Sequence, residues 1–313
     1  MGKKLITVFG ATGAQGGGLA RAILADPGGD FAVRAVTRKP DGDAARALAT
    51  AGAEVVKADL DDVASLRRAL DGAYGAYCVT NYWELMSPDR EIAQAKNIAD
   101  ATKASSVSHI VWSTLEDTRE RVPLDDQHMP TLQGRFKVPH LDTKGESDKH
   151  FDASRTTWFR TSFYWDNLIY FGMGPRPDES GQLGFVLPMG DKKLPGIAAE
   201  DIGKCALGVF KRGARAIGEY IGVAGEHLTG AEMARALSHA LERPVVHRDP
   251  PPAVYRSFGF PGADDLGNMF QYKAEFEAEY CGARSVAESR LLNPELMTFA
   301  AWLSKYKSRM PLS

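Results

Sequence analysis

A run of glycines between a short apolar segment and a helical pattern constrains the fold of this chain more than any other feature. Residues 5–9 are apolar and lead into Gly10-Ala11-Thr12-Gly13-Ala14-Gln15-Gly16. In a strand–turn–helix unit with this spacing, Gly10 permits the tight turn, Gly13 lets the backbone approach a bound pyrophosphate, and Gly16 allows close packing of helix on sheet. The amide groups at the start of the helix then face the phosphates. The loop therefore predicts a dinucleotide-binding unit of the Rossmann type.

Strands and helices alternate through the first half of the chain. Besides the strand at 5–9 and a helix at 19–24, the hydrophobic pattern predicts strands at 32–36, 54–57, 75–79 and 109–112, and helices at 43–51, 62–70 and 87–105. Such alternation indicates βαβ units and a parallel sheet with right-handed crossovers. We therefore predict an α/β fold, a doubly wound parallel sheet with a smaller C-terminal α+β lobe.

The second half of the chain is less regular. Residues 118–139 hold three prolines and show no clear period, which is typical of a surface loop with a functional or mobile role. Residues 172–184 form a second irregular stretch that is rich in Gly and Pro. We further expect a helix from 144 to 151, strands at 157–161 and 220–223, and helices at 231–241 and 299–306.

The two lobes are expected to interleave in sequence. The sheet needs the strands at 157–161 and 220–223 from the second half of the chain. We therefore assign residues 1–163, together with 197–224, to the dinucleotide-binding domain. Residues 164–196 and 225–313 then form the smaller lobe, which closes the cleft.

Composition and charge argue against several other classes of protein. The formal net charge is −2, whereas proteins that bind nucleic-acid backbones are usually basic. No apolar stretch approaches the roughly 20 residues that cross a bilayer, so we expect no membrane partner. Cys78, Cys205 and Cys281 are scattered and the histidines lack ligand spacing, which predicts a cytoplasmic protein without a metal site. Asp125-Asp126 and Asp264-Asp265 fit solvated loops or helix caps.

The residue after the second strand bears on the choice between NAD and NADP. An NAD site places a carboxylate on the ribose 2′-hydroxyl, about twenty positions after the glycine loop. Here the strand at 32–36 ends in Thr37-Arg38-Lys39, without a carboxylate. A guanidinium can hold a 2′-phosphate through paired charge-assisted hydrogen bonds. Arg38 therefore predicts NADP(H) in preference to NAD(H), and the alternative is a solvated basic turn.

Three segments carry a family resemblance. They run from Val8 to Gly17, over Val36-Thr37-Arg38, and over Val79-Thr80-Asn81-Tyr82-Trp83-Glu84. Together they resemble the NmrA-like branch of the atypical short-chain dehydrogenase/reductase superfamily, and within it the HSCARG-type NADPH sensors. The similarity extends to Gly259-Phe260-Pro261-Gly262-Ala263 and Asn268-Met269-Phe270. It covers nearly the whole chain and implies NADP(H) binding and a role as a redox sensor.

The resemblance implies further contacts with the dinucleotide at the ends of two strands. Ligands of open α/β sheets bind at the carboxyl ends of strands, which supports this placement independently. The implied residues are Asp59 and Leu60, beside the adenine, and Thr80, Asn81 and Tyr82, around the central ribose and phosphates.

The resemblance also implies two contacts near the nicotinamide. Lys144 would lie near the nicotinamide ribose, and Tyr164-Trp165-Asp166-Asn167 would close over the nicotinamide. The alternatives are a surface lysine and an aromatic residue in the core between the lobes.

The identity of a catalytic acid stays open. Ordinary short-chain dehydrogenases use a Tyr-x-x-x-Lys pair, whereas the corresponding segment here is His140-Leu141-Asp142-Thr143-Lys144. Residues i and i+4 share a helix face, and an imidazole titrates near neutrality. His140 and Lys144 are therefore candidate catalytic residues, with Tyr164 as a third. Ser113 lies where the usual catalytic serine falls, and the alternative for His140 is a loop residue before the helix.

Two functions from different classes remain open. The first is an NADP(H) sensor or regulator that changes conformation and protein partner with the cofactor. The second is an NADPH-dependent reductase of a small conjugated substrate such as a quinone, imine or enone, because the cofactor carries most of that chemistry. The missing tyrosine favours the sensor, and His140 with Lys144 favours the reductase. A protein partner and a homodimer are left open.

Overall fold

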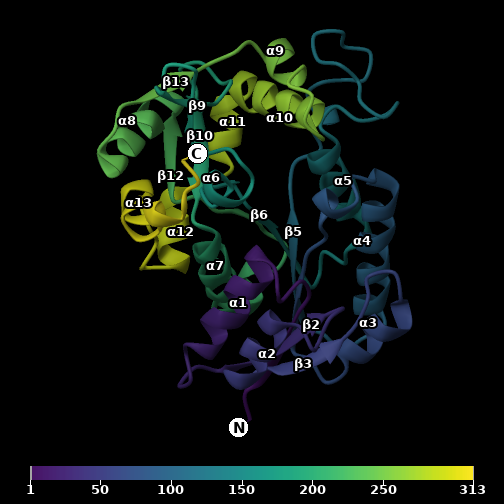
Figure 1. Cartoon of the computed structure of the whole chain (residues 1–313). Helices are drawn as coiled ribbons and strands as arrows, with labels where there is room; N and C mark the ends of the chain where they lie inside the picture. The colour runs from purple at the N-terminus through teal and green to yellow at the C-terminus, as the bar shows by residue number, and fades with distance from the viewer. Residues whose placement is uncertain (1, 313) are drawn as a thin grey trace.

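A seven-stranded parallel sheet forms the centre of the computed structural model, which describes residues 2–312 (Figure 1). The strand order is β11-β6-β5-β4-β1-β2-β3, and every pairing in the sheet is parallel. The predicted doubly wound α/β sheet is therefore confirmed. Its strands are β1 (Lys4–Val8), β2 (Phe31–Thr37), β3 (Glu54–Lys57), β4 (Gly75–Cys78), β5 (His109–Thr114), β6 (Thr156–Arg160) and β11 (Tyr220–Gly222).

The sheet takes β6 and β11 from the second half of the chain, as we expected for residues 157–161 and 220–223. The domain boundaries that we placed at 163 and 164, 196 and 197, and 224 and 225 stay a prediction.

Helices cover both faces of the sheet (Figure 1). On one face lie α1 (Ala14–Leu24), α2 (Asp43–Thr50) and α7 (Ala199–Arg212), and their apolar residues share a core with β1 and β2. On the other face lie α3 (Val63–Leu70), α4 (Pro88–Lys103) and α5 (Pro139–Ser147). The helices α1 and α7 approach closely, since a Cβ on Gly203 would lie 2.1 Å from the carbonyl carbon of Gly18. Side chains here would separate the helices, so the small residues are required.

The remaining elements build a second lobe around two small sheets. One sheet has the order β12-β10-β7 and the other β13-β9-β8. Aromatic side chains fill the core of this second lobe, among them Trp165, Phe270 and Trp302. Its strands are β7 (Phe163–Tyr164), β8 (Arg176–Pro177), β9 (Leu183–Val186), β10 (Lys193–Ile197), β12 (Glu226–Thr229) and β13 (Val245–Arg248). Its helices are α6 (Asn167–Tyr170), α8 (Gly230–Leu241), α9 (Pro252–Arg256), α10 (Ala263–Glu275), α11 (Glu277–Gly282), α12 (Val286–Leu292) and α13 (Phe299–Tyr306).

The interpretation of residues 118–139 as a surface loop was only partly right. The segment is largely irregular and lies beside α10 at the top right of Figure 1. However, Met129, Phe136 and Lys137 are buried, and the Lys137 ammonium donates to the carbonyl groups of Asp126 and Met129 at 2.7 and 2.6 Å. These carbonyls satisfy the buried charge, which allows the loop to insert into the second lobe.

Two further expectations were wrong. The helix expected to start at 144 is α5, which begins at Pro139 and ends at Ser147, because proline is favoured in the first turn of a helix. Residues 172–184 are not wholly irregular, since β8 and the start of β9 lie in them and β9 pairs with β13.

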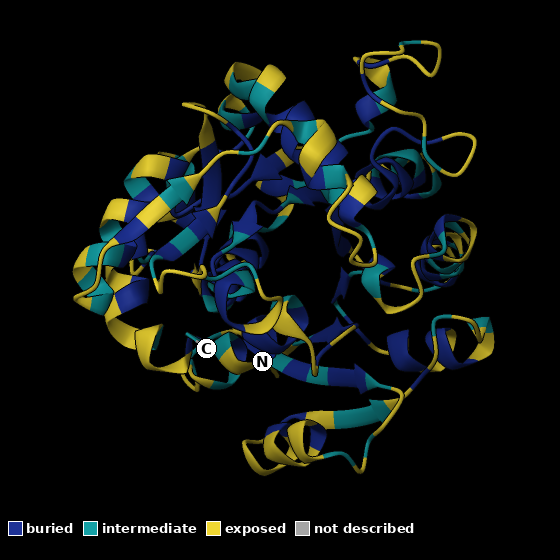
Figure 2. Ribbon diagram, turned by 45° about the horizontal axis from the view of Figure 1, so that its top comes forward, coloured by how far each residue is buried: buried dark blue, intermediate teal, exposed yellow. Residues whose placement is uncertain are grey.

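Burial follows the layers of the fold. Figure 2 shows the central strands and the inward helix faces as buried, and the outer helix faces as exposed. Within residues 2–312, no helix is long and apolar enough to cross a membrane.

Candidate functional site

The glycine loop lies at the carboxyl end of β1, between the ends of β2 and β4. The amide of Ala11 donates to the carbonyl oxygen of Val36 at 3.3 Å. On the other side, a Cβ on Gly10 would lie 3.0 Å from Cγ1 of Val79, and Gly10 adopts a φ of +64°. A Cβ on Gly16 would lie 2.5 Å from the carbonyl oxygen of Gly10. Only glycine fits at these two places, so the sequence fixes the tight turn from β1 into α1.

The start of α1 offers backbone donors to an anion. Its N-cap residue is Gly13, and no side chain among residues 2–312 caps this helix end. The first amide groups of a helix have no partner within the helix, and with the helix dipole they attract phosphate. The glycine loop therefore fits the pyrophosphate of a dinucleotide.

Gln15 gathers three hydroxyl groups at the inner end of the site. Its amide oxygen accepts hydrogen bonds from Tyr77 at 2.5 Å and from Ser113 at 2.7 Å. Its amide nitrogen donates to the hydroxyl of Tyr164 at 2.5 Å. Burial raises the pKa of the Tyr164 hydroxyl, so this side chain stays protonated near neutral pH. Ser113 and Tyr164 are thus both hydrogen-bonded to the side chain of Gln15 in the glycine loop.

Arg38 follows β2 and forms an ion pair across the loop. Its Nη2 lies 2.7 Å from Oε1 of Glu84, the last residue of the 3₁₀ turn η1 (Tyr82–Glu84) that follows β4. Asp59 is exposed and Leu60 is half-buried after β3, on the same edge of the sheet. Arg38, Asp59 and Leu60 therefore lie where the adenosine half of a dinucleotide is expected.

Lys144 is buried in a polar network at the end of β4. Its ammonium donates to the hydroxyl of Thr80 at 2.8 Å and to the Thr80 carbonyl at 3.0 Å. It also lies 3.2 Å from Glu91, which accepts hydrogen bonds from Thr80 and Thr143. Lys144 is therefore not the surface lysine of the alternative, and no contact joins it to His140 or Tyr164 among the residues described.

His140 forms a buried pair with a residue of the second lobe. Its Nδ1 lies 2.6 Å from Oδ1 of Asp265, at the start of α10, and its backbone amide donates to the same carboxylate. Its ring centre lies 4.8 Å from that of Trp83. The expectation that Asp265 is solvated was wrong, because α10 presses its first turn onto α5. His140 belongs to α5, so the alternative of a loop residue before the helix is also wrong.

The other residues expected at the site are spread more widely. Asn81 is exposed, and Tyr82 is buried with its hydroxyl accepting a hydrogen bond from Gln133 at 3.1 Å. Trp165 points into the core of the second lobe, where its ring centre lies 5.3 Å from that of Phe299. Asp166 accepts the amide of Ala199 at 2.8 Å, and Asn167 begins α6.

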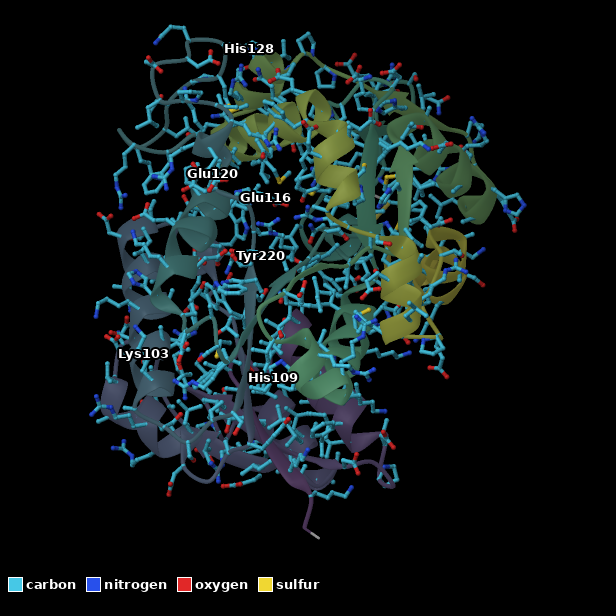
Figure 3. The ribbon with its side chains drawn as sticks, turned by 180° about the vertical axis from the view of Figure 1, so that it is seen from behind. Lys103, His109, Glu116, Glu120, His128 and Tyr220 are labelled. Carbon is cyan, nitrogen blue, oxygen red and sulfur yellow. The ribbon has the colours of Figure 1, made fainter. Side chains whose placement is uncertain are left out.

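A polar cavity of about 320 Å³ lies apart from this edge, between α5, β6 and the second lobe. Glu116, Glu120 and Tyr220 line it and lie near one another in Figure 3. Arg284 is fully buried, and its guanidinium donates to both carboxylate oxygens of Glu116 at 2.7 and 2.9 Å. Arg284 lies between α11 and α12, so the pair joins the second lobe to the end of β5. Arg284 also donates to the carbonyl of Thr161, which follows β6.

A model described as the NmrA-like family matches residues 2–303. The chain belongs to the NmrA-like family. A curated relative, the NmrA-like family domain-containing oxidoreductase FrzB of Cladobotryum sp, is 33% identical over 222 residues, which are 66% of this chain and 64% of that relative.

Solved structures share the fold of this NmrA-like protein. NmrA, a negative transcriptional regulator solved in complex with NAD, has a TM-score of 0.77 at 23% identity over 97% of this chain and 95% of its own. Its complex with NADP gives a TM-score of 0.75. The triphenylmethane reductase of Citrobacter sp., complexed with NADP(H), gives 0.72 at 18% identity over 97% and 99% of the two chains.

Four features of the site in this NmrA-like protein were not predicted from its sequence. They are the three hydrogen bonds of Gln15, and the pairing of Glu84 with Arg38, of Glu91 with Lys144 and of Asp265 with His140. Each bond joins elements far apart in the chain, as with His140 and Asp265, which are separated by 125 positions. The acidic residues themselves were visible, but their spacing carried no sign of these partners.

Proposed function

We propose that this NmrA-like protein binds NADP(H) in preference to NAD(H) and acts as a sensor or regulator that responds to NADPH. The observation that carries the proposal is the place of Arg38, directly after β2 and beside the glycine loop. No carboxylate ends β2, where an NAD site would hold one. The complexes of NmrA with NAD and NADP, and of the triphenylmethane reductase with NADP(H), support a dinucleotide in this fold.

Different residues of the site bind different parts of the dinucleotide. The glycine loop holds the pyrophosphate, Arg38 holds the 2′-phosphate, and Asp59 and Leu60 flank the adenine. The ends of β4 and β7 serve the nicotinamide half, through Thr80, Asn81, Tyr82, Lys144 and Tyr164. We keep Asp166 and Asn167 in the proposal as residues that support this end, and regard Trp165 as a packing residue.

The contacts of residues 118–138 connect the proposed cofactor site with the second lobe, as a sensor requires. Gln133 reaches Tyr82, which follows β4 at the proposed site. The side chain of Asn268 in α10 donates to the carbonyl groups of Pro130 and Lys137 at 2.9 and 2.6 Å. A cofactor that orders the end of β4 therefore acts on the loop and on α10 together.

NADPH is expected to protect residues 118–138 from limited proteolysis and from amide hydrogen exchange. Irregular segments open more readily than the core, so a gain of contacts at Tyr82 should slow their opening. The strand β9 serves as an internal control, because it pairs with β13 and β8 in the second lobe. Residues 172–182 are left out of the control, since the amide of Met173 donates to the carbonyl of Asn167. Equal exchange of residues 118–138 with and without NADPH would speak against a cofactor-driven switch.

The pair of His140 and Asp265 favours a second candidate function, an NADPH-dependent reductase of a quinone, imine or enone. With Nδ1 held by Asp265, Nε2 is the ring nitrogen left to exchange a proton. Bound NADPH would supply a hydride to the substrate carbon, and His140 would supply the proton to the substrate heteroatom. Burial keeps the Tyr164 hydroxyl protonated, so Tyr164 is a second donor.

His140→Ala should lower turnover by about a hundredfold if this reductase activity exists, which is the lower range for a general acid. NADPH affinity should stay the same, because the glycine loop and Arg38 lie at the other half of the dinucleotide. The assay is NADPH oxidation across a panel of quinones, imines and enones. His239→Ala is the matched control, since His239 is exposed on α8. A panel without any reduced member counts against the enzyme, and an unchanged rate in His140→Ala counts against this donor.

We also propose a cytoplasmic location. Cys78, Cys205 and Cys281 are free thiols, and two of them are buried, which suits a reducing compartment.

A further inference from the structure

The ion pair of Arg38 and Glu84 spans the carboxyl edge of the sheet. Arg38 follows β2, and Glu84 lies in η1 after β4. The strand β1 pairs with β2 on one side and with β4 on the other. The 2.7 Å contact between Nη2 and Oε1 therefore bridges the two segments that flank the glycine loop.

A second ion pair lies next to the first. Arg90 of α4 and Asp61 are 2.5 Å apart, and the hydrogen bond from Arg90 lowers the pKa of Asp61, with a contribution from the charge of Arg38. Two cations and two carboxylates thus share one exposed cluster, and the charge of Asp59 also acts on Arg90. Removing the charge of Glu84 makes this cluster more positive by one charge.

We propose that Glu84 is a specificity-determining residue of the cofactor site, because its carboxylate competes with the 2′-phosphate of NADPH for Arg38. The inference rests on the proposed NADP(H) site. NADH carries a neutral 2′-hydroxyl and leaves the ion pair in place. NADPH displaces Glu84 from Arg38, so binding of the 2′-phosphate changes the contacts of η1.

The exposure of the pair sets the size of this competition. The side chains of Arg38 and Glu84 are 53% and 41% exposed, and such surface pairs are weak. A phosphate forms stronger paired bonds with a guanidinium, so it wins the competition. The carboxylate nevertheless repels the phosphate through water, and this repulsion lowers NADPH affinity by about fivefold.

The segment around Glu84 connects the displacement to the rest of the site. The amides of Glu84, Leu85 and Met86 donate to carbonyls within the turn, and Met86 adopts a φ of +47°, which residues other than glycine rarely adopt. Trp83 packs on Gly262 of the second lobe, where an added Cβ would lie 2.8 Å from its ring. Release of Glu84 is therefore expected to loosen the amides of residues 84–86 at the end of this turn, while Tyr82 keeps its contact with Gln133.

Calorimetric titration of NADPH and NADH against the wild type and Glu84→Gln tests the proposal. The ratio of NADPH to NADH affinity should rise about fivefold in Glu84→Gln at low salt. At 1 M salt, where the Debye length is about 3 Å, the rise should shrink to less than about twofold. Glu54→Gln is the matched control, because Glu54 pairs with Arg34 at the other end of β3 and should leave the ratio unchanged.

Hydrogen exchange gives a readout that a purely structural role would not move. NADPH, but not NADH, should speed exchange of the amides of residues 84–86 in the wild type, and Glu84→Gln should abolish this difference. A ratio that stays within twofold of the wild type, or falls, overturns the proposal while the NADP(H) site stands. If the wild type binds neither nucleotide, the proposed function and this inference fail together.

Discussion

Arg38→Asp is expected to weaken NADPH binding by roughly a hundredfold or more, because two charge-assisted hydrogen bonds of about 1.5–3 kcal/mol each are lost. The new carboxylate also faces Glu84 and Asp61, which adds repulsion toward a phosphate. NADH should change by less than about threefold, since its neutral 2′-hydroxyl forms no ion pair with the guanidinium. Calorimetric titration of both nucleotides measures the two effects.

Arg243→Asp provides the control for this substitution. Arg243 is exposed after α8, and its replacement changes the net charge by the same amount. Arg243→Asp should leave both affinities unchanged. Equal losses for NADPH and NADH in Arg38→Asp would show that Arg38 supports the site without reading the 2′-phosphate.

Glu116→Gln is expected to lower the free energy of unfolding by about 3 kcal/mol at pH 7, the cost of leaving a buried charge without its partner. Arg284 is fully buried and holds both oxygens of Glu116. Burial alone would raise the pKa of Glu116, but the charges of Arg284 and Arg160 hold it at about 2. Urea denaturation at pH 7 measures the loss.

The effect of Glu116→Gln should depend on pH in a defined direction. The pKa of Glu116 is lower in the folded chain than its ordinary value of 4.5, so the unfolded chain binds more protons as the pH falls. The contribution of Glu116 is therefore complete above pH 4.5 and is lost between about pH 4.5 and 2. The stabilities of the wild type and Glu116→Gln should converge over this range.

Glu120→Gln is the control for the same cavity. Glu120 lines the cavity but is exposed, so its neutralisation should cost less than about 0.5 kcal/mol. A Glu116→Gln protein as stable as the wild type at pH 7 would contradict the role given to the buried pair.

The sequence predicted the sheet because each of its strands carries its own signal. The glycine loop fixed β1 and α1, and the alternation of apolar runs located β2 to β5. The strands β6 and β11 were found as short runs of β-branched and aromatic residues. By contrast, β8 and β9 were missed because Gly and Pro surround them, and β13, the second partner of β9, follows only some 60 residues later in the chain.

The residues of the site likewise fall into those that the sequence predicted and those that it did not. Gly10, Gly16 and Arg38 were predictable because their role depends on position next to β1 and β2. The carboxylates at Glu84 and Asp265 act only through contacts that the folded chain creates. Asp142 illustrates the limit, since its buried carboxylate accepts from Thr118 at one end of the irregular loop and from Lys137 and Val138 at the other. No spacing rule in the sequence predicts these hydrogen bonds of Asp142.

Side-by-side calorimetric titration of NADPH and NADH against the unmodified chain tests the central claim most directly. The account predicts that both bind at one site, and that NADPH binds at least about tenfold more tightly, since a guanidinium gains about 1.4 kcal/mol or more from the 2′-phosphate. Equal affinities, or tighter binding of NADH, would contradict the assignment of Arg38 and with it the proposal of a protein that responds to NADPH.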